Sequence, residues 1–79
     1  MRLDKWLKVS RLIKRRTVAQ EACDGGRVSV NGVVAKPSRD VKVGDIIEVT
    51  FGSKTLRAEI LSVQETVRKD DAAAMYKEL

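Results

Sequence analysis

The sequence predicts an α+β fold in which two N-terminal helices pack on a small, mostly antiparallel sheet of about four strands. Three observations predict it. Apolar residues recur at helical spacing over residues 2–13. A second short helical segment, residues 18–24, ends at a pair of glycines. From residue 28 onward, valine-rich alternating segments are separated by turn signals, which is typical of short antiparallel strands.

The first helix is expected over residues 2–13. Leu3, Trp6 and Leu7 share one face and are interpreted as core. Base stacking by the tryptophan is the less common alternative for such a stripe. Arg2 lies in the first turn, where the helix dipole disfavours a cation. A bound phosphate is one explanation for it, and chance is the other. The opposite, solvent face is expected to carry Asp4, Lys5, Lys8 and Arg11.

The second helix is expected to begin at Thr17 as its N-cap. Thr17 and Gln20 match the capping-box spacing, in which the two side chains satisfy free backbone N–H groups. Cys23 is interpreted as a small buried apolar residue. The residues expected to face inward are Val18, Ala19, Ala22 and Cys23.

The strands follow from turn chemistry. Asn31-Gly32 is a strong two-residue hairpin signal between residues 28–30 and 33–35. Gly52-Ser53 suits a type II′ turn between residues 46–51 and 56–63. After residue 63 the strand pattern fades. The pair Asp70-Asp71 is then expected to start a short last helix, residues 72–79. This helix either docks on the body through Met75 and Leu79 or frays. The expected division is a domain over 1–66 and a helical tail over 67–79.

Charge is unevenly distributed along the chain. The net charge is +5, and residues 1–20 hold seven Lys or Arg against one acid. Residues 46–79 hold five bases against six acids. Such asymmetry favours a polyanionic partner, with a solvated basic surface that aids solubility as the alternative.

Several function classes lack support. The chain has one cysteine and no histidine, so neither a disulfide nor a His/Cys zinc site is expected. No glycine-rich phosphate loop or other catalytic constellation occurs, so we expect neither an enzyme nor a cofactor. No apolar run is long enough to span a membrane, and no signal peptide is visible. We therefore expect a cytoplasmic protein.

Residues 10–17 concentrate four cations just ahead of the second helix. A helix N-terminus binds anions through its free N–H groups, and Lys14, Arg15 and Arg16 would extend that site to phosphates. The second helix is short for a DNA recognition helix and carries acids where base-reading residues would lie. Recognition of RNA through its phosphates and 2′-hydroxyls fits better, with a merely solvated helix end as the alternative.

Four ordered motifs carry a resemblance to a known family. They are Arg2-Leu3-Asp4-Lys5-Trp6-Leu7, Arg15-Arg16-Thr17-Val18-Ala19-Gln20, Gly26-Arg27-Val28-Ser29-Val30-Asn31-Gly32 and Val41-Lys42-Val43-Gly44-Asp45-Ile46-Ile47. Over residues 2–50 the chain resembles the RNA-binding domain named after small-subunit ribosomal protein S4. Within that family, residues 1–17 are most similar to the stand-alone RqcP-type proteins of bacterial ribosome-associated quality control. Heat-shock protein fifteen is a more distant relative.

The resemblance implies an α-L fold and a non-catalytic role. It implies binding to 23S rRNA and to P-site tRNA on obstructed large ribosomal subunits, beside RqcH, which directs alanine tailing of the stalled chain. We expect neither a membrane nor a DNA partner, and we expect a monomer. The RNA-binding residues that it implies are Arg2, Lys5, Arg11, Lys14, Arg15, Arg16 and Thr17, with Arg2 and Arg16 foremost. A general structured-RNA chaperone and a protein-interaction module remain alternatives.

Overall fold

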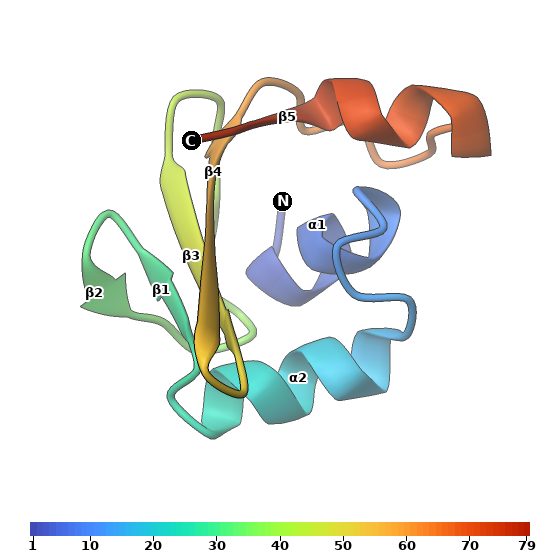
Figure 1. Ribbon diagram of the computed structural model, residues 1–79. Helices are drawn as coiled ribbons and strands as arrows, with labels where there is room; N and C mark the ends of the chain where they lie inside the picture. The colour runs from blue at the N-terminus through green and yellow to red at the C-terminus, as the bar shows by residue number, and fades with distance from the viewer.

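The computed structural model describes residues 1–79 and confirms the α+β class. Its sheet is antiparallel with the strand order β2-β1-β3-β4-β5, and the helices cover one of its faces (Figure 1). None of the helices combines the length and the apolar character that a membrane span requires. The elements are α1 (Leu3–Val9), α2 (Arg16–Asp24), β1 (Val28–Val30), β2 (Val33–Val34), β3 (Ile46–Phe51), β4 (Lys54–Ile60), the 3₁₀ helix η1 (Lys69–Met75) and β5 (Tyr76–Glu78).

The first helix is shorter than expected. It ends at Val9 instead of continuing to residue 13. The backbone then turns left-handed at Arg11, with φ 64°, and the N–H of Ile13 bonds back to the carbonyl of Leu7 at 3.1 Å. This left-handed turn is a common way to close a helix, and it satisfies a free carbonyl of the last turn. Residues 10–15 therefore form an irregular corner between the two helices.

The core lies between the helices and the sheet. The side chains of Leu3, Trp6 and Leu7 are fully buried, which confirms their interpretation as core and leaves Trp6 no free face for a base. The indole N–H of Trp6 donates to the carbonyl of Ser62 at 2.9 Å. The expected inward face of α2 is confirmed except at Val18, which is 46% exposed because the buried face runs through residues 19, 22 and 23.

The two expected hairpin turns are confirmed. Asn31 and Gly32 both have positive φ angles, 52° and 83°, as a type I′ turn requires. The Asn31 side chain also accepts from the Ile46 N–H at 2.9 Å and donates to the buried Asp45 carboxylate at 3.1 Å. Gly52 has φ 59° in the two-residue turn that joins β3 to β4. The fourth strand ends at Ile60 and not at residue 63.

The expected C-terminal helix over residues 72–79 is wrong in its second half. The helix is η1, and the chain after Met75 becomes the fifth strand, which pairs with the otherwise open edge of β4. Unpaired edge groups of a strand favour such an addition. Met75 is buried, the Tyr76 ring meets Trp6 edge-on with centroids 6.4 Å apart, and Leu79 stays exposed. Residues 69–78 thus belong to the same packed body.

Candidate nucleic-acid interface

Asp4 is a buried acid that contacts two of the expected site residues, Arg2 and Arg16. Its side chain is fully buried, although the sequence pattern placed it on the solvent face of the first helix. That expectation is wrong because this position of α1 faces α2, where cationic and amide donors meet the carboxylate. We call Arg2, Asp4, Arg16 and Gln20 the Asp4 cluster.

Each arginine of the cluster donates two hydrogen bonds to the carboxylate. Arg2 donates from Nε to Oδ1 at 3.1 Å and from Nη2 to Oδ2 at 3.2 Å. Arg16 donates from Nε to Oδ2 at 3.3 Å and from Nη2 to Oδ1 at 3.5 Å. Gln20 Nε2 and the backbone N–H of Lys5 add bonds at 2.9 and 2.8 Å. Asp4 therefore fixes the direction of two guanidinium groups from different segments.

The carboxylate stays ionised at neutral pH. Burial raises the pKa of Asp4, but the hydrogen bonds from Arg2, Gln20, Arg16 and the Lys5 backbone outweigh burial and lower the pKa to about 2. Two guanidinium groups against one carboxylate leave a net positive charge. Arg2 is the extended N-cap residue of α1 and not part of its first turn, and its charge is balanced by Asp4, so no bound phosphate is needed to explain its position.

The arginines keep free donors for a ligand. Their side chains are 50% and 41% exposed, for Arg2 and Arg16 respectively. A guanidinium has five N–H donors, and the bonds to Asp4 use Nε and Nη2, so the Nη1 donors remain. Two arginine forks held in this way can bind phosphate oxygens with little loss of side-chain entropy.

The N-terminus of α2 is open, and the expected capping box is wrong. The helix begins at Arg16, one residue ahead of Thr17, with the extended residue Arg15 as N-cap, and no side chain caps it. Thr17 is exposed within the first turn, and the Gln20 amide bonds to Asp4 instead of capping. The first turn contains no acidic residue. Its free N–H groups therefore lie open to an anion.

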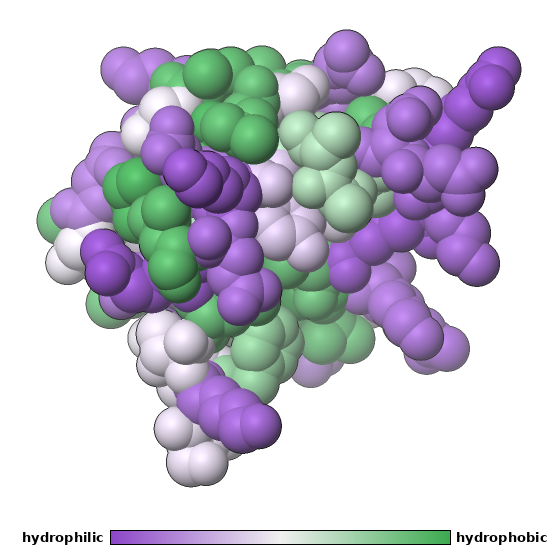
Figure 2. Space-filling model, turned by 45° about the horizontal axis from the view of Figure 1, so that its top comes forward, coloured by the Kyte–Doolittle hydropathy of each residue, from purple (hydrophilic) through white to green (hydrophobic).

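The remaining expected residues divide into two groups. Lys5 forms an ion pair with Glu65 at 3.5 Å, so its charge is partly engaged by the C-terminal segment. Arg11, Lys14 and Arg15 are exposed along the corner between the helices. Figure 2 shows hydrophilic side chains crowding the right-hand side of the molecule, where that corner and η1 lie in Figure 1.

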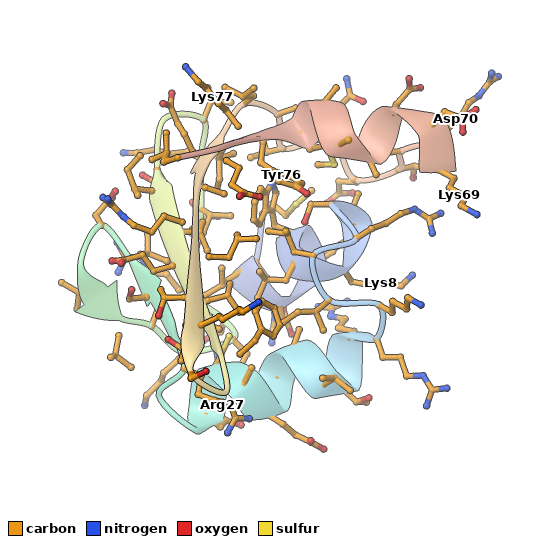
Figure 3. The ribbon with its side chains drawn as sticks, viewed as in Figure 1. Lys8, Arg27, Lys69, Asp70, Tyr76 and Lys77 are labelled. Atoms are coloured by element: carbon orange, nitrogen blue, oxygen red, sulfur yellow. The ribbon has the colours of Figure 1, made fainter.

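Arg11 and Lys14 also line a groove of about 700 Å³. The groove runs between the end of α1 and the segment that leads into η1, and Figure 3 shows Lys8 and Lys69 extending toward this same side of the molecule. The sequence pattern placed Lys8 on the positive face but did not single out Lys69, whose acidic neighbours masked it. The lining residues are Lys8, Val9, Arg11, Lys14, Glu65, Thr66, Val67 and Lys69.

No group of three or more His, Cys, Asp or Glu side chains is arranged to hold a metal ion. Cys23 is buried, and its burial, with the nearby carboxylates of Asp4 and Asp24, raises the pKa of its thiol to about 11. The chemistry that the basic surface offers is therefore electrostatic binding and hydrogen bonding to anions.

Comparison with known proteins gives concordant results. The family model of the S4 domain matches residues 1–47. A Streptococcus pneumoniae protein is 56% identical over 77 residues, covering 98% of this chain and 88% of the relative. A Bacillus subtilis protein is 55% identical over 76 residues, with 96% and 88% covered. Both relatives are named RQC P-site tRNA stabilizing factor.

Heat shock protein 15 is more distant in sequence. The Escherichia coli protein is 34% identical over 79 residues, which cover 99% of this chain and 59% of that protein. The structure of the Vibrio cholerae protein, described as trimeric, superposes with a TM-score of 0.93 at 35% identity. That match covers 100% of this chain and 81% of the other.

Proposed function

This chain belongs to the S4 domain family, and we propose that it is an RNA-binding factor of bacterial ribosome-associated quality control. In this proposal it binds 23S rRNA and P-site peptidyl-tRNA on obstructed large ribosomal subunits in the cytoplasm. It supports RqcH-dependent alanine tailing by holding the peptidyl-tRNA in place, and it forms no bond itself. The names of relatives that are 55–57% identical support this role.

The observation that carries the proposal is the Asp4 cluster beside the open N-terminus of α2. Two half-exposed arginines are oriented by one buried carboxylate, and the helix adds free N–H donors next to them. Each part favours a phosphate group. A surface of this kind follows a backbone without reading bases, as expected for a factor that recognises RNA by shape.

The other residues proposed for the site extend the same positive surface. Arg11, Lys14 and Arg15 continue the positive surface along the corner, and Thr17 lies exposed in the first turn of α2. Lys5 is proposed as a weaker contributor because Glu65 already engages it. Arg2 and Arg16 are proposed as the main RNA contacts.

A general structured-RNA chaperone would use the same surface, so the two functions differ in which RNA is preferred. Co-sedimentation separates them. The tagged protein is mixed with large subunits that carry peptidyl-tRNA, with vacant large subunits and with an unrelated duplex. We expect retention to rank in that order. Equal retention on all three would favour the general chaperone.

Substitution tests the site within the same assay. Arg2→Ala and Arg16→Ala should each weaken binding by about 1.5–3 kcal/mol, the usual worth of a charged hydrogen bond. The matched control is Arg57→Ala, because Arg57 is also paired with a carboxylate, Glu48, but lies on the sheet, away from the helices. Undiminished sedimentation of both cluster variants would show that the site is wrongly placed.

A further inference from the structure

We propose that Lys8, Arg11, Lys14 and Lys69 form a second binding site for the phosphodiester backbone of RNA, in the groove between α1 and the C-terminal segment. This inference rests on the proposed RNA-binding function and extends it. The groove shares Arg11 and Lys14 with the surface proposed above and adds Lys8 and Lys69, and none of its lining residues belongs to the Asp4 cluster. Half of its wall comes from residues 65–69, which lie beyond the residues 1–47 that match the S4 domain model.

The charges in this groove have no partner within the protein. None of its four cations forms an ion pair or a side-chain hydrogen bond, whereas Arg2 and Arg16 are both bound to Asp4. The single acid in the lining, Glu65, is engaged by Lys5. Four unpaired like charges facing one groove repel each other, and an anion between them would relieve that repulsion.

The backbone conformation of Arg11 is a second, independent indication that the groove binds a ligand. It has φ 64° at the turn that closes α1, a left-handed conformation in which glycine is the usual residue. A Cβ atom at such a position strains the backbone. Strain of this kind at an exposed cation that lines a groove points to a use for the side chain.

The opposite wall is anchored to the core through Val67, and the η1 helix that follows it is anchored at its end. The carbonyl of Met75, at the end of η1, accepts from the N–H groups of Leu61 and Ser62 at 2.8 and 3.1 Å. Trp6 contacts both Ser62 and Tyr76. These contacts fix the C-terminal end of η1, whose first residue, Lys69, lines the same groove as Arg11.

The shape and lining of the groove favour RNA over an acidic peptide. Only Val9 and Val67 are apolar among its eight lining residues, so it offers little surface for the apolar anchors that peptide recognition uses. Lys14 belongs to the groove, and Arg15 next to it is the N-cap of α2. The cations thus continue from the groove toward the Asp4 cluster, as a path for successive phosphates requires.

The test uses the full chain and a stem-loop RNA, with affinity measured by fluorescence anisotropy across a range of salt concentrations. Lys8→Ala, Lys69→Ala and Arg11→Gly should each weaken binding about three- to tenfold. Each should also lower the log–log salt slope by about 0.9 for a duplex contact or about 0.7 for a single strand. Lys77→Ala, which removes an exposed lysine on β5, is the matched control and should change neither quantity.

Arg11→Gly separates binding from folding. Glycine relieves the left-handed strain, so the urea midpoint, followed by Trp6 fluorescence, should not fall. If Arg16→Ala weakens binding while Lys69→Ala and Arg11→Gly leave affinity and salt slope unchanged, the second site is wrong and the proposed function stands. If the unaltered chain binds neither this stem-loop nor large ribosomal subunits, the proposed function itself fails. If an oligoglutamate competes as well as an oligonucleotide of equal length, the groove takes acidic peptides instead.

Discussion

Arg16 reaches across from the first turn of α2 to the buried carboxylate of Asp4 in α1, with Nε at 3.3 Å and Nη2 at 3.5 Å. This pair links the two helices and at the same time aims the free edge of the guanidinium at solvent. In the proposed RNA-binding site, the same contact would serve both folding and phosphate binding. Substitutions in the cluster should affect both properties.

Asp4→Asn should destabilise the protein by about 2–3 kcal/mol. The amide turns a donor toward the groups that now donate to the carboxylate, and a buried acceptor of charged hydrogen bonds is lost. The loss stays below that of a fully buried pair because both arginines are half-exposed. Urea unfolding followed by Trp6 fluorescence measures it. Asp24→Asn, the same change at an exposed position, should cost little, and equal losses would refute a special role for Asp4.

Stability should fall on acidification between about pH 4 and pH 2. The pKa of Asp4 is lowered from 3.8 to about 2 in the folded protein, so its contribution is present above the unfolded value and is lost as pH falls through the folded value. The shift corresponds to about 2 kcal/mol. Unfolding free energies of the unaltered chain and of Asp4→Asn should converge toward pH 2. A gap that stays constant from pH 6 to pH 2 would contradict the ionised cluster.

Gln20→Ala should destabilise the protein more than Thr17→Ala, which is the reverse of what a capping box would predict. Thr17 makes no capping bond, so its loss should change stability by less than about 0.5 kcal/mol. Gln20 donates to Asp4 at 2.9 Å, so its loss should cost about 1–2 kcal/mol. Thermal unfolding of the two variants side by side is sufficient. A larger loss of stability for Thr17→Ala than for Gln20→Ala would support a capping box instead.

Arg16→Lys should recover only part of the RNA affinity that Arg16→Ala loses. Lysine keeps the charge, but it lacks the planar fork that holds Asp4 and a phosphate at once. We expect a residual loss of about 1 kcal/mol in anisotropy titrations. Arg57→Lys on the sheet serves as the control. Full recovery by lysine would mean that charge alone, without orientation by Asp4, supports binding.

Cys23 should resist thiol reagents in the folded protein. Burial, with the carboxylates of Asp4 and Asp24, raises the thiol pKa to about 11, and the thiolate is the reactive form. Labelling with a chromogenic disulfide at pH 8 should be at least about a hundredfold slower than in urea-unfolded chain. Equal rates would indicate that the helix layer opens readily.

Local chemistry was sufficient to predict most of the elements. Asn31-Gly32 and Gly52-Ser53 marked the two tight turns correctly because their geometry depends on residues that tolerate positive φ. Leu3, Trp6 and Leu7 marked the core because their helical spacing selects one face. The ends of elements were less predictable, and α1 stops four residues early because Arg11 turns left-handed, which nothing in the local pattern signals.

The candidate site, too, could be predicted from the sequence only in part. The concentration of cations in residues 1–20 predicted a basic surface there, but the partners of Arg16 and Lys5 are distant in sequence. Gln20 matched a local capping box, yet a bond to a buried charge 16 positions away is worth more than a cap in water. Lys69 was missed because only the packing of η1 brings it to the groove.

By itself, the sequence determined the α+β class, both hairpin turns, the buried stripe of the first helix and the basic character of one end, since each depends on neighbouring residues alone. Only the tertiary structure decided that Asp4 is buried, that it orients Arg2 and Arg16, that the last residues form a strand, and that Lys69 and Arg11 line one groove. The physical reason is that burial and pairing depend on which surfaces meet. A carboxylate surrounded by donors from another helix is stable in the interior, whereas the same carboxylate on an isolated helix would face water.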